Sequence, residues 1–199
     1  PGDYDLAGFC VGVVERRSII DGRAIQPGDL VIGLASTGFH SNGYSLVRKV
    51  VFERAGLKVT DYAPELGRTV GEALLEPTRI YARPVRQVLA HYRVKNVVHG
   101  IAHITGGGLR ENILRILPPG VQVVLERGSW PTPPVFGWVQ RLGEIDQEEM
   151  ERVFNMGIGM VLLVSPYYAE SIRHQLAHAG VSSWQIGQAV EGPREVLLR

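Results

Sequence analysis

Hydroxyl, amide and imidazole side chains gather in one short loop, Ser36-Thr37-Gly38-Phe39-His40-Ser41-Asn42-Gly43. The loop follows an apolar stretch that is typical of a strand, and it precedes a helical pattern. This arrangement places backbone N–H groups and a helix N-terminus where an anion can bind. The alternative is a purely structural loop, in which Ser41 or Asn42 caps the helix and the glycines form the turn.

Two further glycine-containing loops accompany predicted strands. They are Thr105-Gly106-Gly107-Gly108 and Asn155-Met156-Gly157-Ile158-Gly159. Three successive glycines indicate either close backbone approach by a ligand or unusual dihedral angles. Glycines at 157 and 159 leave room beside their strand, for a ligand or for a packed helix.

Neither common nucleotide-binding fingerprint is complete in these loops. Gly33 and Gly38 have the spacing that begins a P-loop, but Phe39 and His40 stand where that motif needs Lys and Ser or Thr. Glu111 stands where a dinucleotide-binding motif needs its third glycine. The loops are therefore neither a Walker nucleotide site nor a Rossmann dinucleotide site, and ligand binding and structural packing both stay open for them.

The histidines and carboxylates predict no metal site. His99 and His103 lie four residues apart on a predicted strand, and at about 3.3 Å per residue they are roughly 13 Å apart, too far to share one ion. His174 and His178 have a spacing that suits one ion on a helix, but no third ligand lies near them in the sequence. The carboxylates are scattered and form no pair that would bind Mg²⁺.

The elements that must position these loops alternate along the chain. Buried apolar stretches predict strands at 6–16, 30–35, 97–104, 121–125, 158–164, 184–190 and 195–198. Helical periodicity predicts helices at 44–55, 70–75, 77–92, 109–117, 134–142, 147–154 and 168–179. Interleaved strands and helices predict an α+β or α/β layered fold, with a mixed sheet and helices packed on it, in a single domain over 1–199.

Composition excludes several classes of protein. The 21 basic and 20 acidic side chains give a net charge of +1, without the basic excess of nucleic-acid binders. The longest apolar stretch is far shorter than the roughly 20 residues of a membrane span, so no membrane partner is expected. A lone cysteine, Cys10, suits a reducing cytoplasm. Because the chain starts at Pro1 without Met, we expect a piece of a longer protein or a cleaved product.

Five motifs occur in order and at characteristic separations. They are Tyr4-Asp5-Leu6-Ala7-Gly8-Phe9, Gly38-Phe39-His40-Ser41-Asn42-Gly43-Tyr44-Ser45-Leu46-Val47-Arg48-Lys49, Pro77-Thr78-Arg79-Ile80-Tyr81, Ala102-His103-Ile104-Thr105-Gly106-Gly107-Gly108 and Phe154-Asn155-Met156-Gly157-Ile158-Gly159-Met160. Together they resemble the aminoimidazole ribonucleotide synthetases, also called phosphoribosylformylglycinamidine cyclo-ligases. The resemblance covers only the C-terminal half of that enzyme. It implies a layered domain with partial similarity to the ferredoxin-like fold, and an absent N-terminal domain that holds most of the ATP and Mg²⁺.

The resemblance implies ATP-dependent ring closure of formylglycinamidine ribonucleotide to aminoimidazole ribonucleotide, in de novo purine biosynthesis. Substrate or phosphate binding is expected at Ser36, Thr37, Gly38, Ser41, Asn42, Gly106, Gly107 and Gly108, with Asn155 closing the cleft. His40 is the expected catalytic residue, for charge stabilisation or proton transfer, because the pKa of histidine ordinarily lies near working pH. A cytoplasmic homodimer is expected of the full-length enzyme, and the piece alone is expected to be inactive.

Two other hypotheses stay open. A binding or assembly module would keep the fold and lack the chemistry, and a preceding domain of comparable length in the gene would argue against it. Another member of the same superfamily, such as selenophosphate synthetase, thiamine monophosphate kinase or the amidotransferase one step earlier, is the second. The stretch 40–49 favours the cyclo-ligase over these relatives.

Overall fold

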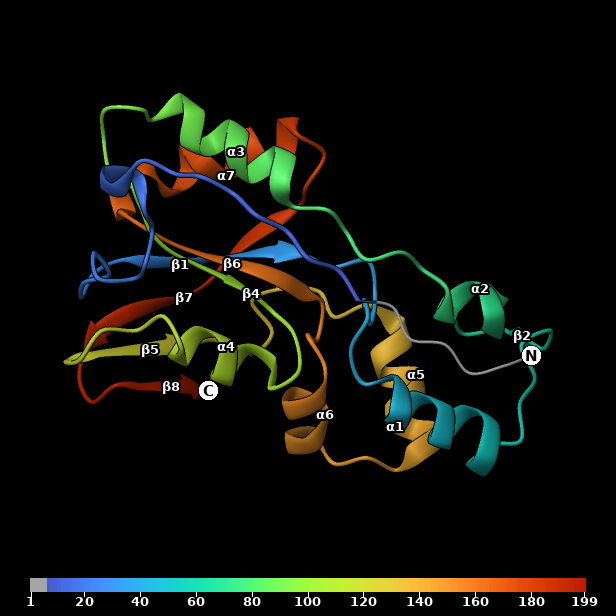
Figure 1. Ribbon diagram of the computed structural model, residues 1–199. Coiled ribbons are helices and arrows are strands. Elements are labelled where there is room, and N and C mark those ends of the chain that lie inside the picture. The colour runs from blue at the N-terminus through green and yellow to red at the C-terminus, as the bar shows by residue number, and fades with distance from the viewer. Residues whose placement is uncertain (1–6) are drawn as a thin grey trace.

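A six-stranded sheet with the order β4-β6-β1-β7-β5-β8 forms the centre of the molecule, seen in a computed structural model that describes residues 7–199 (Figure 1). The strands are β1 (Leu30–Ala35), β4 (Val98–His103), β5 (Val121–Leu125), β6 (Ile158–Val164), β7 (Ser183–Glu191) and β8 (Glu195–Leu198). Neighbours pair antiparallel, except β5 and β8, which are parallel. The predicted mixed sheet and α+β class are confirmed.

Helices cover both faces of this sheet. α3 (Ala82–His91) and α7 (Ala169–His178) lie side by side on one face, and α4 (Gly108–Leu114) lies on the other (Figure 1). Successive side chains of a strand point to opposite faces, so Val31 of β1 joins the α4 side and Ile32 joins the α3 and α7 side. Burial on both faces explains why β1 is continuously apolar.

A second group of helices packs beside the sheet around its own apolar cluster. The group contains α1 (Tyr44–Arg48), the π-helix η2 (Lys49–Arg54), α2 (Val70–Leu74), α5 (Pro134–Gly143) and α6 (Gln147–Val153). Phe39 lies inside this cluster, with its ring centroid 5.2 Å from that of Phe136 and 5.1 Å from that of Phe154. The loop after β1 is thereby anchored by one buried aromatic side chain.

The remaining elements are small. The strands β2 (Tyr62–Ala63) and β3 (Arg68–Thr69) form a two-stranded ribbon, and η1 (Arg16–Ser18) and η3 (Pro166–Tyr168) are single 3₁₀ turns. No helix within residues 7–199 has the length and the apolar character needed to cross a membrane.

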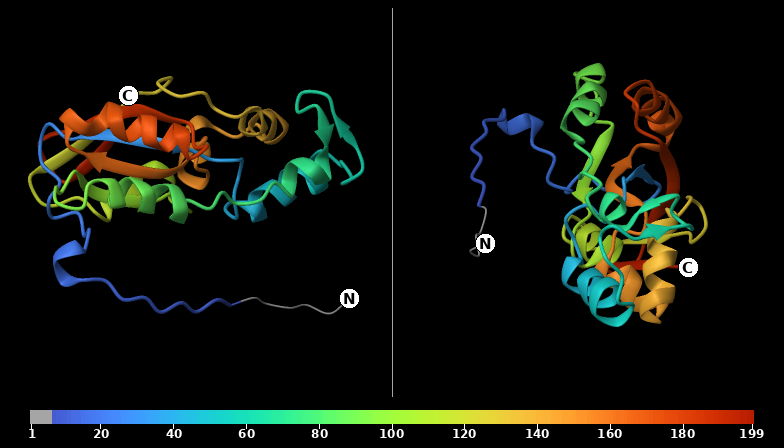
Figure 2. Two further views of the ribbon diagram at one scale, coloured as in Figure 1. Left: turned by 90° about the horizontal axis from the view of Figure 1, so that it is seen from above. Right: turned by 90° about the vertical axis from the view of Figure 1, so that its right-hand side faces the viewer.

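The strand predicted over residues 6–16 is wrong within the described residues. Residues 7–15 have no strand partner, and their trace stands clear of the sheet (Figure 2). Phe9 is 95% exposed and Val13 is fully exposed. Residue 6 lies outside the described residues. An apolar, β-prone segment forms a strand only where a neighbouring strand accepts its hydrogen bonds.

The helix predicted from Pro77 begins later than expected, at Ala82. Pro84 is therefore the third residue of α3, where a backbone N–H has no partner within the helix, so the proline breaks no hydrogen bond. Residues 77–81 remain outside any helix and cross to the loop after β1.

Candidate functional site

The three glycine-containing loops meet at one end of the sheet. β1 and β4 both pair antiparallel with β6, so their C-terminal ends lie beside the start of β6. The backbone N–H of Ser36 donates to the Gly157 carbonyl over 2.8 Å, and that of Ile104 donates to the Gly159 carbonyl over 2.9 Å. The loops at 36–43 and 155–159, which are more than a hundred residues apart in the sequence, thus belong to one site.

The buried side chain of Asn155 holds the loop after β1 in place by hydrogen bonds. Its side-chain oxygen accepts hydrogen bonds from the Ser36 hydroxyl at 2.9 Å and the Gly157 N–H at 2.8 Å, and its amide nitrogen donates to the Gly38 carbonyl at 2.8 Å. Asn155 is only 1% exposed. A buried amide with these partners positions the loop, whereas the family resemblance led us to expect Asn155 to close the cleft.

The loop itself offers a row of backbone donors. The N–H groups of Gly38, Phe39, His40 and Ser41 have no hydrogen-bond partner among residues 7–199. His40 adopts a left-handed conformation, with φ of 57°. Successive N–H groups around a left-handed residue can form a concave nest that binds anions, and we use the name nest for the backbone N–H groups of residues 38–41.

His40 occupies the centre of this loop and is 4% exposed. Its Nε2 accepts a hydrogen bond from the Thr37 N–H at 3.2 Å, and the Arg79 N–H lies 3.5 Å away. Its Nδ1 has no partner within residues 7–199. Burial, with smaller effects from His103 and Arg79, lowers the pKa of His40 to about 4. The expectation that His40 titrates near working pH is wrong, because the interior holds the ring neutral.

Sequence reasoning did not assign Tyr81 and His103 to the site. The centroid of the Tyr81 ring lies 6.1 Å from that of His40 and 6.3 Å from that of His103. The Tyr81 hydroxyl donates to the Ala35 carbonyl at 2.7 Å, and burial raises the pKa of Tyr81. A Cβ at Gly159 would overlap both Tyr81 and His40, so this glycine makes room for the pair. The signal was present, since both aromatic residues fall within motifs that carry the family resemblance.

His99 takes no part in this cluster. It is buried, and its Nδ1 lies 2.7 Å from the Asp29 carboxylate, whereas His103 is exposed. A β-bulge between Val98 and Gly100 interrupts the register there. Within residues 7–199, no three His, Cys, Asp or Glu side chains gather in a way that could hold a metal ion.

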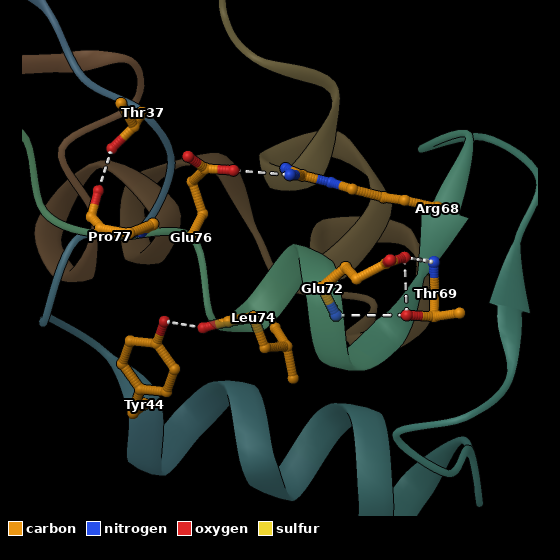
Figure 3. A network of polar contacts seen from close by, with 8 residues as sticks. All are labelled: Thr37, Tyr44, Arg68, Thr69, Glu72, Leu74, Glu76 and Pro77. Carbon is orange, nitrogen blue, oxygen red and sulfur yellow. Dashed lines mark hydrogen bonds and ion pairs between the residues drawn. The ribbon is translucent and has the colours of Figure 1, made fainter.

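The segment 76–78 borders the loop after β1 (Figure 3). The Thr37 hydroxyl donates to the Pro77 carbonyl at 2.6 Å, and the Ser41 and Thr78 hydroxyls lie 3.0 Å apart. Glu76 pairs with Arg68 at 2.6 Å, which ties this segment to the β2–β3 ribbon. Two of the hydroxyls predicted to bind substrate, those of Thr37 and Ser41, are therefore engaged with this neighbouring segment.

α2 fixes the other end of that segment. Thr69 and Glu72 form a reciprocal capping box at the start of α2, and the Tyr44 hydroxyl of α1 donates to the Leu74 carbonyl at its end (Figure 3). The side-chain and backbone bonds from Thr69 lower the pKa of Glu72. α2, which is tied to α1 through Tyr44, thus fixes the start of the segment 76–78 that contacts the loop after β1.

The second glycine loop is held by hydrogen bonds to α6 and α4 as well as within itself. The Gly107 N–H donates to the Arg152 carbonyl at 3.0 Å, and the Gly108 N–H donates to the Thr105 carbonyl at 3.1 Å. The Asn112 amide donates to the Gly108 carbonyl at 2.8 Å. Packing therefore explains Gly107 and Gly108, while Gly106 is exposed and its N–H has no partner in residues 7–199.

Comparison with known proteins identifies relatives of the whole chain. Residues 26–198 match the family described as AIR synthase related protein, C-terminal domain. The chain is 51% identical over 197 residues to the phosphoribosylformylglycinamidine cyclo-ligase of Caldanaerobacter subterraneus subsp. tengcongensis, which covers 99% of this chain and 57% of the relative. It is 52% identical over 185 residues to the same enzyme of Syntrophus aciditrophicus, and this alignment covers 93% of this chain and 52% of the relative. The chain thus spans somewhat over half the length of these curated relatives.

Solved structures share the fold at low identity. A thiamine-monophosphate kinase from Stenotrophomonas maltophilia K279a has a TM-score of 0.59 at 13% identity, covering 93% of this chain and 54% of that one. E. coli HypE, a hydrogenase maturation protein, has a TM-score of 0.59 at 19% identity, covering 94% and 50%. Identities this low extend to the fold alone. From the family match and the half-identical relatives, this chain belongs to the AIR synthase related protein family and carries its C-terminal domain.

Proposed function

We propose that this chain supplies the substrate- and phosphate-binding loops of a phosphoribosylformylglycinamidine cyclo-ligase. The reaction is the ATP-dependent ring closure of formylglycinamidine ribonucleotide to aminoimidazole ribonucleotide in purine biosynthesis. The convergence of three glycine-containing loops at one end of the sheet carries the proposal. The names of relatives at about 50% identity support it.

In this proposal, the loop after β1 anchors a phosphate. The unpaired backbone N–H groups of residues 38–41 are donors that need no side-chain movement to bind an anion. The side chain of Asn42 lies half-buried at the end of the nest and is a further donor. Thr37 and Ser41 contribute by holding residues 77–78, and Asn155 contributes by holding Gly38.

His40 acts in this scheme as a neutral hydrogen-bonding group. Because Nε2 accepts the Thr37 N–H, the proton of the neutral ring is on Nδ1, which is buried and has no partner among residues 7–199. A neutral donor of this kind stabilises negative charge that develops on a reacting oxygen. Ring closure also needs the two ends of the substrate held together and water excluded, which a buried His40 beside Tyr81 favours.

ATP supplies the phosphoryl group that activates the formyl oxygen when it is bound. The nest and the exposed Gly106 suit phosphate oxygens, whereas residues 7–199 offer no cluster of ligands for Mg²⁺. We therefore place the Mg²⁺ ion, and most of the ATP site, on a preceding domain of the complete enzyme. A homodimeric, cytoplasmic enzyme is part of the same proposal.

Substitutions at the nest test this function in the complete enzyme. We expect His40→Ala and Asn42→Ala each to lower turnover by about 100-fold or more, because each removes a donor to the reacting substrate. Asn96→Ala is the matched control, since this exposed asparagine precedes β4 at the opposite end of the strand. Steady-state ADP release measures the result. Wild-type turnover in both nest variants would contradict the proposal.

The isolated chain is expected to show no turnover. An assay of the 199-residue chain alone, beside the complete protein, checks this by following ADP release with both substrates present. Turnover by the chain alone would contradict the assignment of ATP to a preceding domain. A complete protein that binds the ribonucleotide without turnover would instead identify a binding module.

A further inference from the structure

We propose a second binding site in this chain, which takes a small aromatic carboxylate. The site is a cavity of about 130 Å³ between α4, α6, the turn at 127–132 and the end of β8. No residue of the loops at 36–43 and 105–108 lines it. Met156 of the third glycine-containing loop does line the cavity, which therefore adjoins the proposed substrate site without sharing the donors of the other two loops.

The interior of the cavity is apolar. Its apolar lining consists of Leu109, Trp130, Phe154, Met156 and Leu198. The indole N–H of Trp130 is already donated to the Met156 carbonyl at 2.9 Å, so the ring adds no unpaired donor to the interior. Apolar cavities of roughly 150 Å³ hold one benzene ring. The body of the ligand is accordingly a single ring.

Two of the three charged side chains at the cavity neutralise each other. The Glu151 carboxylate is 8% exposed and receives both bonds of a bidentate pair from Arg127, at 2.8 and 2.9 Å. Burial raises the pKa of Glu151, but hydrogen bonds from Arg127 and Gln147 outweigh it and lower the pKa. Glu151 and Arg127 thus contribute no net charge.

Arg110 supplies the remaining positive charge. Its guanidinium lies 3.7 Å from a Glu151 oxygen and makes no hydrogen bond with any of residues 7–199. The side chain is partly exposed where α4 borders the cavity. A guanidinium with unpaired N–H groups matches a carboxylate in charge and geometry. An apolar cavity with one such group fits a ring that carries one carboxylate.

The cavity also borders residues that hold the loops at 36–43 and 105–108. The inference drawn from this contact rests on the proposed function. Phe154 and Met156 flank Asn155, which holds the loop after β1. The Arg152 carbonyl, one residue beyond Glu151, accepts the Gly107 N–H. A ligand in the cavity therefore stiffens segment 151–156, and we expect slower amide exchange in both loops when it is bound.

Benzoate is the probe that tests this site. We expect saturable binding to the 199-residue chain, followed by calorimetry and by tryptophan fluorescence, to which Trp130 contributes, with benzyl alcohol and benzylamine binding at least tenfold more weakly. Arg110→Gln should weaken benzoate binding at least tenfold, while Arg86→Gln, on the exposed side of α3, should not change it. Because Arg110 is partly exposed, thermal unfolding should confirm that the variant is folded.

The outcomes separate this inference from the proposed function. The absence of saturable benzoate binding, or binding that Arg110→Gln leaves unchanged, would overturn the cavity site and would not affect the nest variants. Loss of turnover in His40→Ala with intact benzoate binding supports both proposals. Benzoate binding that slows no amide in residues 36–43 or 105–108 keeps the site and removes its link to the loops.

Discussion

At the residue scale, two buried polar side chains fix the proposed phosphate loop. His40 accepts the Thr37 N–H, and Asn155 binds both ends of the segment 36–38. Neither side chain is exposed enough to exchange these partners with water. The role of each side chain can therefore be tested by the free energy of unfolding of its variants, independently of the proposed chemistry.

Acid should destabilise the protein through His40. Its pKa is lowered in the folded state from 6.5 to about 4, so the unfolded state binds the proton first as pH falls. The contribution of His40 to the free energy of unfolding is therefore complete above about pH 6.5 and is lost as the pH falls towards 4. A pKa shift of this size corresponds to about 3 kcal/mol. Urea unfolding at several pH values measures the free energy of unfolding against pH, and this dependence should have a shallower slope in His40→Gln than in the wild type. The exposed His91→Gln should keep the wild-type slope, and equal slopes in all three proteins would contradict the burial effect.

Removal of the Asn155 amide should destabilise the fold. Asn155→Ala leaves the Gly38 carbonyl, the Gly157 N–H and the Ser36 hydroxyl without their partner, and we expect a loss of about 3 kcal/mol in the free energy of unfolding. Asn96→Ala, at an exposed position, should change it by less than about 0.5 kcal/mol. Chemical denaturation measures both, and similar values for the two variants would rule out the bracing role.

At the element scale, the site depends on strand pairing and on close backbone packing. β1 and β4 reach the same end of the sheet because β6 pairs with both. α4 then approaches α6 so closely that a Cβ at Gly108 would overlap the Glu151 carbonyl oxygen. The glycine loop before α4 is thus shaped by the contact between these two helices.

Alanine substitutions should distinguish Gly108 from Gly106 in this loop. Gly108 has φ of 59°, and a Cβ there would overlap the Glu151 carbonyl, so Gly108→Ala should cost about 2–3 kcal/mol. Gly106 has open space around its Cβ position, and Gly106→Ala should be within about 0.5 kcal/mol of wild type. Thermal and urea unfolding give the two values, and a neutral Gly108→Ala would show that the helices separate easily.

At the scale of the whole molecule, the described chain has a packed sheet with helices and one segment that packs on nothing. Residues 7–15 are exposed throughout, although the sequence there is rich in apolar residues (Figure 2). Exposed apolar segments of this kind are typical of interaction surfaces. Their side chains contribute nothing to the stability of the rest of the chain.

Charged substitutions in this segment should therefore leave stability unchanged. We expect Phe9→Asp and Val13→Asp to shift the free energy of unfolding of the 199-residue chain by less than about 0.5 kcal/mol. The same change in the buried β1 residue Val31, as Val31→Asp, should prevent folding. Circular dichroism during urea unfolding reports both, and a large loss in Phe9→Asp would mean that the segment packs against the sheet.

The sequence alone determined most of the elements and the three loops. Apolar stretches such as 30–35 and 158–164 are strands because both of their faces are buried, and this leaves a plain signal in local composition. The motifs around His40 and Gly106 also pointed to the family. Local patterns contain this information because secondary structure and loop chemistry depend on neighbours in the chain.

Only the tertiary structure decided how the site is assembled. The neutrality of His40, the central place of Tyr81 and the buried position of Asn155 arise from contacts between β1, β6 and residues 77–81, which are distant in the sequence. The exposed segment 7–15 has the composition of a strand and no partner strand among residues 7–199. Burial and strand pairing are properties of neighbours in space, so a linear pattern cannot fix them.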